Sequence, residues 1–371
     1  MIVLSLKVNN LYQFEHFDMN LSYPKKIVDS TILNEHLEGH PNFRYKKAII
    51  LMGANATGKT TLGRVFMSIF AFMAKKDYGP MVAGICNKRE TALFCMDFVQ
   101  DNILYRISTE INSHANDMSY STSDFLTEVS SIKILANDSY ESCVRRLEER
   151  TEDHATNYID ELDKIPSLTW LFEFPFDDPQ QARLVNPVNF KVYGYYLEKV
   201  LCILDPRITK VDQVKENETT YVIRHQSFNI VMDNGQLVKP QLLSSGTRDG
   251  IGIANLIATM KLHACSFYYC DEQFSHVHSD VEKAFLSLLI DTLGPNEQMF
   301  FTTHNSDLLT MNLPKHTYAF LVRDPFAENH ITCVFASDYL KKSTDSLKNA
   351  VENDLFSSSP DTDSIYDLIN Q

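Results

Sequence analysis

The sequence predicts an α/β fold that carries an antiparallel β subdomain and an inserted helical subdomain. Three observations lead to this prediction. A short apolar run at 47–52 is followed at once by a glycine-containing loop and an apolar helix. Two further apolar runs, at 266–272 and 300–305, end in polar residues, as buried strands of an α/β sheet do. The segment 92–107 has the pattern of an antiparallel hairpin.

The first 111 residues are expected to form one lobe with an N-terminal hairpin and the glycine-containing loop. Apolar side chains alternate with polar ones at Leu4, Leu6 and Val8, which predicts a half-buried strand. The run KAIILM is short and rich in β-branched residues, as buried strands are. In order, we expect strands at 2–8, 14–21 and 47–52, a helix at 62–74, and hairpin strands at 92–98 and 103–107.

The middle of the chain differs in character, because residues 112–190 are more polar and are interrupted by prolines. The segment 139–165 is expected to be helical, and we assign 112–190 to the inserted subdomain. Residues 191–353 are expected to complete the first lobe, and 354–371 to be a flexible tail. Within 191–353 we expect a buried helix at 192–204 and strands at 221–223 and 228–238, the last folded around the turn dipeptide Asn234-Gly235.

Composition excludes several classes of protein. The chain of 371 residues has a net charge of −14, so a broadly basic nucleic-acid surface is not expected, although a local basic groove stays open. Seven scattered cysteines without a CxxC pair argue against a disulfide framework or zinc site. The N-terminus lacks the pattern of a signal peptide, and the longest apolar helix, 62–74, carries Arg64 and is too short for a bilayer. We therefore expect a cytoplasmic protein with no membrane contact.

The segment GANATGKTT matches the GxxxxGK[ST] pattern of a P-loop, with a strand before it and a helix after it. Its glycines let the backbone approach phosphates, and the N-terminus of the following helix favours negative charge. Lys59 is expected to reach the β- and γ-phosphates of ATP, and Thr60 to bind Mg²⁺. A chance glycine turn is the alternative, and the flanking elements argue against it. The predicted nucleotide-binding residues are Gly53, Ala54, Asn55, Ala56, Thr57, Gly58, Lys59, Thr60 and Thr61.

The segment SFYYCDE is an apolar strand that ends in two acids. Ligands bind outside the carboxyl ends of parallel strands, so this is a suitable place for catalytic groups. Asp271 is expected to hold the Mg²⁺ shell, and Glu272 to orient or deprotonate an attacking water. The alternative is that the two acids only begin a loop, and the P-loop upstream favours the functional interpretation.

The segment FFTTHN repeats this arrangement with a histidine, 32 positions after Glu272. An imidazole at a strand end could contact the γ-phosphate and sense its loss, which makes His304 a candidate catalytic residue. A lone histidine is more often structural or exposed. His276 and His278, which lie beside the acid pair, are expected to be loop or interface residues.

The segment LLSSGTRDG precedes a second apolar helix and lies between the P-loop and the acid pair. A helix N-terminus with serines and a glycine can bind an anion. Because one P-loop already serves one nucleotide, this second site would serve the γ-phosphate of another chain. The alternative is a capped helix start, and local sequence alone favours that alternative. The residues concerned are Leu243, Ser244, Ser245, Gly246 and Thr247.

In this order, GANATGKT, LSSGT, YYCDE and TTHN resemble the Walker A, signature, Walker B and switch-histidine motifs of ABC-type ATPase heads, a group that contains the SMC and RecF-like proteins. The signature is generally LSGGQ-like, and here Ser245 replaces the first glycine and Thr247 the glutamine. This LSSGT variant, followed by an arginine, resembles bacterial ATPases related to the overcoming-lysogenisation-defect (OLD) nucleases and the RloA-like abortive-infection proteins.

Two departures from the family pattern matter. No glutamine is assigned to the Q-loop, since Gln100 lies in the expected hairpin turn and Gln180 and Gln181 in the insertion. The OLD nucleases carry a C-terminal TOPRIM nuclease domain, whereas only 67 residues follow His304. The resemblance therefore implies a nuclease or toxin effector on another polypeptide.

The resemblance implies an ATPase switch that uses ATP and Mg²⁺ and dimerises head to tail, as a homodimer or higher homo-oligomer. It implies a role in antiphage defence, with a phage-derived trigger. Two alternatives stay open: a RecF- or SMC-like role in DNA repair or maintenance, and a scaffold that ATP stabilises without turnover. SMC-like arms are not expected, because only about 25 helical residues are available, some 38 Å at roughly 1.5 Å per residue.

Overall fold

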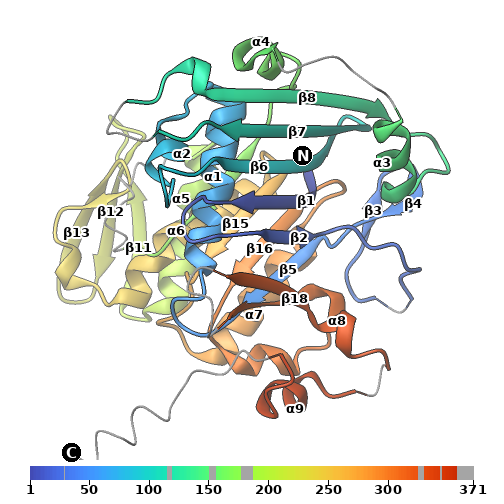
Figure 1. Cartoon of the computed structure of the whole chain (residues 1–371). Helices are drawn as coiled ribbons and strands as arrows, with labels where there is room; N and C mark the ends of the chain where they lie inside the picture. The colour runs from blue at the N-terminus through green and yellow to red at the C-terminus, as the bar shows by residue number, and fades with distance from the viewer. Residues whose placement is uncertain are drawn as a thin grey trace, which may run out of the picture. The chain divides into compact units, whose positions relative to one another are not determined.

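The computed structural model describes residues 1–28, 30–114, 119–149, 156–176, 187–324, 330–342 and 345–356. The chain divides into two compact units (Figure 1). Unit 1 comprises Met1–Leu168 and Leu309–Gln371, and unit 2 comprises Thr169–Leu308. None of the helices in the described residues is long and apolar enough to cross a membrane.

Unit 1 contains an antiparallel sheet in the order β2-β1-β6-β7-β8-β9 (Figure 1). Its strands are β1 (Ile2–Asn9), β2 (Phe17–Asn20), β6 (Ala92–Gln100), β7 (Ile103–Ile111), β8 (Phe125–Lys133) and β9 (Thr156–Asn157). The predicted hairpin is confirmed as β6–β7, and its turn residues Asp101 and Asn102 both have positive φ angles. The second strand begins later than predicted, because the Phe14 N–H donates to the Leu11 carbonyl and closes a turn.

Helices cover both faces of this sheet. On one face, Phe72 of α1 (Lys59–Lys75) packs against Phe94 of β6 and Phe125 of β8, with α4 (Tyr158–Leu162) beside it. On the other face, α3 (Tyr140–Glu148) packs in a core with Val99 and Ile132. The remaining elements of this lobe are β3 (His36–Leu37), β4 (His40–Arg44), α2 (Gly79–Ala83) and the 3₁₀ turn η1 (Thr122–Asp124).

A second group of strands in unit 1 leads into the P-loop. β5 (Ala48–Met52) is buried along its whole length and pairs in parallel with β17 (Tyr318–Arg323). β18 (Ile331–Phe335) pairs antiparallel with β17. The sequence prediction of a buried strand at 47–52 is confirmed. The 3₁₀ turn η4 (Lys315–Thr317) and the short helices α8 (Ala336–Tyr339) and α9 (Leu347–Glu352) complete this region.

Unit 2 is built on three parallel strands: β10 (Trp170–Glu173), β15 (Phe267–Asp271) and β16 (Gln298–Thr302). β15 and β16 are the two apolar runs that the sequence predicted. Two helices flank them in sequence, α6 (Ser245–Lys261) before β15 and α7 (Ser279–Thr292) between β15 and β16. Stacked aromatic rings, such as Tyr269 on Phe300, form the core between neighbouring strands.

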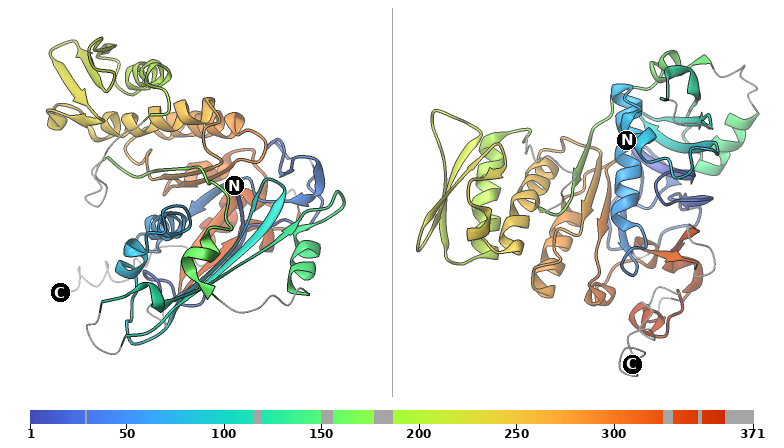
Figure 2. Two further views of the ribbon diagram at one scale, coloured as in Figure 1. Left: turned by 90° about the horizontal axis from the view of Figure 1, so that it is seen from above. Right: turned by 60° about the vertical axis from the view of Figure 1, so that its left-hand side comes forward.

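A small antiparallel sheet lies beside α5 (Phe190–Leu204) in unit 2, and α5 packs in turn on α6 (Figure 2). A Cβ atom on Gly250 would lie 2.7 Å from Leu204, so the glycine permits this close approach of the two helices. The turn at Asn234-Gly235 and the helix at 192–204 are confirmed. The strands are β11 (Ile208–Gln213), β12 (Thr220–His225), β13 (Asn229–Asp233) and β14 (Gln236–Leu237), followed by the turn η2 (Pro240–Leu242).

The range 112–190 contains strands as well as helices. β8 belongs to the sheet of unit 1, and β10 pairs with β15. One continuous helix at 139–165 is wrong, because α3 ends at Glu148 and Thr156–Asn157 pair with β8. The domain limits at 111/112, 190/191 and 353/354 stay a prediction, and residues 357–371 of the expected tail lie outside the described residues.

Candidate functional site

The predicted P-loop lies between β5 and α1 in unit 1. Its conformation depends on two glycines: Gly53 has φ +151° and Gly58, the N-cap of α1, has φ +98°. A Cβ atom on Gly53 would lie 2.7 Å from the Leu321 carbonyl oxygen. Ala56 also has a positive φ angle, and both Asn55 and Ala56 are exposed. The loop therefore bends sharply with its middle open to solvent, as an anion-binding turn must.

Lys59 folds back over its own loop. Its Nζ atom donates to the Gly53 carbonyl at 2.9 Å and to the Ala54 carbonyl at 3.2 Å, and the residue is only 4 % exposed. The Thr57 hydroxyl donates to the Ala54 carbonyl at 2.8 Å. The structure therefore holds an ammonium group beside the loop, where it can contact a bound phosphate with a small movement.

The start of α1 can accept an anion. In the described chain, no side chain caps this helix, so its first N–H groups are directed at the loop. Thr60 and Thr61 lie half-buried in its first turn. The Thr60 hydroxyl is an oxygen donor of the kind that Mg²⁺ prefers.

The sequence did not indicate that the loop between β1 and β2 lies against the P-loop. A Cβ atom on Gly58 would collide with the Gln13 amide nitrogen and lie 3.2 Å from the Phe14 ring. Gln13 is thus a candidate contact for a nucleotide. In the structure, Asn10, Tyr12 and His16 of this loop have positive φ angles. These angles cannot be read from the sequence, so the sequence analysis did not find the contact.

In unit 2, Asp271 and Glu272 lie at the end of β15, next to Thr302 at the end of β16. The Thr302 hydroxyl donates to Asp271 Oδ1 at 2.7 Å and accepts from the Glu272 N–H at 3.0 Å. Asp271 is completely buried, and Glu272 has a φ angle of +44°. This threonine, which the sequence analysis did not single out, holds the Asp271 carboxylate and the Glu272 backbone.

The structure brings Glu272 and His304 together. Glu272 Oε1 lies 2.7 Å from His304 Nε2, and both side chains are partly exposed, at 24 % and 37 %. A carboxylate paired with an imidazole at an open edge can orient a water molecule and exchange a proton with it. The carboxylate and the imidazole therefore form one unit, although 32 positions separate them in sequence.

The residues on either side of His304 are anchored to α7. Thr303 Oγ1 and Asn305 Nδ2 each donate to a different oxygen of Glu282, both at 2.7 Å. Asn305 Nδ2 also contacts the Ser279 hydroxyl at 3.0 Å. Burial raises the pKa of Glu282 above its ordinary value. This network fixes the backbone on both sides of His304.

The predicted signature begins α6. Ser244 is the N-cap, and its hydroxyl accepts from the Thr247 N–H at 3.2 Å and contacts the Thr247 hydroxyl at 2.7 Å. The Arg248 guanidinium donates to Ser245 at 3.2 Å. The capped helix start is therefore present, with Leu243 buried and Ser244 exposed. A role of this segment towards a second chain stays a prediction.

Inside unit 2, the signature helix contacts the loop that follows the acid pair. His276 Nδ1 lies 3.0 Å from Asp249 Oδ2, and a Cβ atom on Gly246 would lie 2.7 Å from the His276 carbonyl. His278 caps α7, and its Nδ1 accepts from the Asp280 N–H at 3.3 Å. Both histidines lie in this loop, as expected, and their interface role is a prediction.

Behind the acid pair lies a buried polar cluster that the sequence analysis missed. Glu173 ends β10 and pairs with Cys270, and its Oε1 accepts from Asn255 at 2.6 Å. The side-chain amide of Gln273 is fully buried, and neither of its polar atoms has a hydrogen-bond partner among the described residues. A Cβ atom on Gly252 would lie within 2.8 Å of both Gln273 and Glu173. Only the pairing of β10 with β15 reveals this cluster.

The Q-loop stays unassigned. Gln100 ends β6, next to the hairpin turn, as expected, and Gln180 and Gln181 lie outside the described residues. The predicted Mg²⁺ ligands, Thr60 and Asp271, both offer oxygen atoms, which fits that ion. Among the described residues, no group of three or more His, Cys, Asp or Glu side chains is placed so that it could hold a metal ion.

No protein-family model and no curated protein matches the chain. Solved structures do. An Smc head bound to the C-winged helix domain of ScpA has a TM-score of 0.51 and 12 % identity, covering 90 % of this chain and 98 % of that one. An Smc head with an extended coiled coil, bound to the C-terminal domain of ScpA from Pyrococcus furiosus, has a TM-score of 0.50 and 10 % identity, covering 96 % and 100 %. The chain thus has the predicted fold of an ABC-type P-loop ATPase head.

Proposed function

We propose that this protein is an ABC-type ATPase that binds and hydrolyses ATP and works as a switch. The observation that carries the proposal is the contact of Glu272 with His304 at 2.7 Å, at the ends of adjacent parallel strands, in a chain that also contains a complete P-loop. The structural likeness to the Smc heads supports the fold alone, because the sequence identity is low. The proposed activity therefore rests on these residues.

Each side chain has a defined role in this proposal. Lys59 and the N-terminus of α1 bind the phosphates. Glu272 orients the attacking water and accepts its proton, while His304 holds the carboxylate in place and contacts the γ-phosphate. Thr60 and Asp271 would hold Mg²⁺, which neutralises phosphate charge when bound. Catalysis is then mainly positioning and charge stabilisation.

Residues Leu243–Thr247 are proposed to complete the ATP site of a second copy, which makes the protein a head-to-tail homodimer or higher homo-oligomer. The N-terminus of α6 supports this proposal, because an anion placed there would meet the positive end of a 17-residue helix. ATP binding would close the dimer, and hydrolysis would release it.

Trapping the ATP-bound state tests the dimer. In the Glu272→Gln variant we expect ATP and Mg²⁺ to produce a stable dimer, because binding is kept while hydrolysis falls about 10²–10⁴-fold. Mass determination by light scattering measures the dimer, and Glu218→Gln, at an exposed position, is the control. Adding Ser244→Arg to the trapped variant should return it to monomer. A variant that stays monomeric with ATP bound would rule out the composite site.

For the biological process, we propose the sensor ATPase of an antiphage system acting with a separate effector, such as a TOPRIM-type nuclease. The LSSGT signature followed by Arg248, with its resemblance to the OLD and RloA-like ATPases, supports this assignment. Both Smc heads were solved with a domain of a partner protein, which fits an ATPase that acts on another polypeptide. We expect that expression of this gene together with its neighbouring gene becomes toxic to the cell only when the cell is challenged with phage.

A RecF- or SMC-like role in DNA repair or maintenance is the second candidate, and the resemblance of the four motifs to that group supports it. Stimulation of ATP hydrolysis by DNA ends would support this role over defence. A scaffold that binds ATP without turnover is the third, and the intact Glu272 argues against it. Measurable turnover that is lost in Glu272→Gln would exclude the scaffold.

A further inference from the structure

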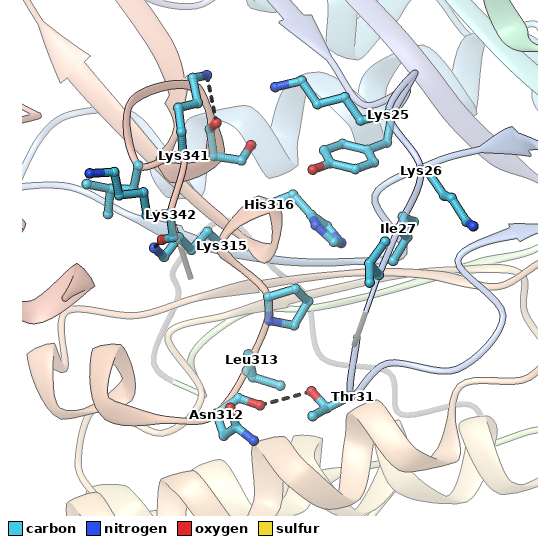
Figure 3. Close-up of a pocket in the computed structure, with 15 residues that line it drawn as sticks. Lys25, Lys26, Ile27, Thr31, Asn312, Leu313, Lys315, His316, Lys341 and Lys342 are labelled. Carbon is cyan, nitrogen blue, oxygen red and sulfur yellow. Dashed lines mark hydrogen bonds between the residues drawn. The ribbon is translucent and has the colours of Figure 1, made fainter. Parts of the chain in front are cut away.

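Unit 1 contains a pocket that uses none of the P-loop residues. Three segments line it: residues 23–28 with Thr31, residues 312–316 and residues 337–342 (Figure 3). Its volume is about 500 Å³. Pockets of this size hold ligands of the size of a nucleotide or a small metabolite.

The pocket is strongly basic. Among the described residues, no aspartate or glutamate lines it. Figure 3 shows lysines on two opposite sides, with His316 between them. This concentration is unusual in a chain with 48 acidic and 34 basic residues. The lysines are Lys25, Lys26, Lys315, Lys341 and Lys342.

Most of this charge is not neutralised within the described part of the chain. Lys315 pairs with Asp345 at 3.9 Å and donates to the carbonyl oxygen of Lys342. Lys341 donates to the Ser337 carbonyl at 3.0 Å. A carbonyl oxygen satisfies a hydrogen bond but leaves the ammonium charge in place. Because Lys25, Lys26, Lys341 and Lys342 are exposed, the pocket presents a positive field to solvent.

Buried contacts hold the walls of the pocket. His316 Nε2 lies 2.5 Å from Glu35 Oε1, and both side chains are at least 95 % buried. The Tyr23 ring packs on the His316 ring with centroids 4.5 Å apart. The Thr31 hydroxyl donates to the Asn312 carbonyl at 2.9 Å and joins two of the three segments. The site is therefore preformed, so binding does not have to order it.

Part of the lining is apolar. The apolar side chains that line it and offer contact to an organic group are Ile27, Leu313, Pro314 and Leu340. Lysine is a phosphate binder that acts as a point charge, and here several act together. A ligand with an organic body and phosphate groups would use both kinds of lining.

We propose that this pocket binds a small phosphate-bearing organic anion of nucleotide size, at a site separate from the P-loop. The net charge of −14 favours a compact ligand over a nucleic acid, because a long polyanion would extend beyond the pocket and meet acidic surface. Ligand binding here is independent of the ATPase proposal, since no P-loop residue lines the pocket.

Calorimetry tests the proposal, with pyrophosphate and AMP as separate probes. The full chain carries Lys59→Met to weaken binding at the P-loop, and circular dichroism verifies its fold. We expect Lys341→Ala with Lys342→Ala to weaken both probes at least tenfold. Lys215→Ala with Lys239→Ala, at exposed positions outside the pocket, is the matched control and should bind as before. Equal affinity in the two double variants would overturn the proposal.

Lysine acetylation of the unmodified chain provides a second readout that needs no variant. Pyrophosphate should protect Lys341, Lys342 and Lys25 from acetylation, and leave Lys215 and Lys239 reactive, as read by mass spectrometry. Unchanged reactivity at the pocket lysines would overturn the proposal. A 15-nucleotide single strand that binds the pocket more tightly than AMP would also overturn it, and would make the pocket a nucleic-acid interface.

Discussion

The P-loop in unit 1 and the strand-end cluster in unit 2 are organised in opposite ways. The Lys59 ammonium donates to the Gly53 and Ala54 carbonyls, which lie six and five positions earlier in the chain. In unit 2, Thr302 contacts Asp271 across 31 positions, and His304 contacts Glu272 across 32. The first site therefore has hydrogen bonds within its own loop, whereas the second depends on the register of two parallel strands.

This difference predicts where substitutions act. A change in the P-loop should remove ligand binding without disturbing strand packing. A change at the strand ends should affect catalysis and folding together, because the same side chains orient the acids and join the strands.

The largest expected effect is at Lys59. In Lys59→Met, the loss of a phosphate-binding ammonium should lower kcat/KM for ATP hydrolysis about 10³-fold, or about 4 kcal/mol. A steady-state phosphate-release assay measures it. Lys75→Met, at an exposed position in the same helix, is the control. Equal rates in the two variants would show that the loop does not bind the substrate's phosphates.

The next effect concerns stability and pH in unit 1. Lys46 donates to the Asn20 and Ser22 carbonyls, and burial lowers its pKa to about 8. Between pH 8 and its ordinary value of 10.5, the unfolded state binds more protons, so stability rises with pH across this window.

Lys46→Met should remove this dependence. The free energy of unfolding of the wild type, relative to the variant, should increase by about 3 kcal/mol from pH 8 to 10.5. Urea unfolding at several pH values measures it, with exposed Lys133→Met as control. If the difference in the free energy of unfolding between the wild type and Lys46→Met stayed constant from pH 8 to 10.5, Lys46 would have the same pKa in the folded and unfolded states.

His304→Ala should lower the rate of ATP hydrolysis about 10²-fold, slightly under 3 kcal/mol, because Glu272 loses its 2.7 Å partner and the γ-phosphate a contact. ATP affinity should stay within a few fold. His263→Ala, whose side chain is exposed and contacts Glu297, tests whether the effect is specific. A matching fall in both variants would assign the loss to folding.

The smallest effect is expected at Thr302. Thr302→Val removes the hydrogen bond that Thr302 donates to Asp271 and the one that it accepts from the Glu272 N–H, which should lower hydrolysis about tenfold and stability by about 1–3 kcal/mol. Thr302→Ser keeps the hydroxyl and should restore both. Activity assays and urea unfolding of the same preparations separate the two readouts. An active and stable valine variant would remove the link between strand packing and catalysis.

The sequence by itself determined the elements whose signals are local. Apolar runs predict strands at 47–52, 266–272 and 300–305 and a hairpin within 92–107, and the structure has them at 48–52, 267–271, 298–302 and 92–111. The helix after the P-loop begins at Lys59, three positions before the predicted start at Leu62. Their positions could be predicted because hydrogen bonds within a turn or helix join residues a few positions apart. The interruption of the helix expected at 139–165 could not be predicted in this way, because it depends on the pairing of Thr156–Asn157 with β8.

Only the tertiary structure decided which of these elements meet. β10 is four residues long and lies among prolines, so its pairing with β15, which buries Glu173 beside the acid pair, has no signal in sequence. The Glu272–His304 contact depends on strand register, and the lysine pocket depends on three segments whose residues range from Tyr23 to Lys342. The physical reason is that strand pairing and side-chain packing select contacts by geometry across the fold, whereas a sequence motif records only what neighbouring residues can do.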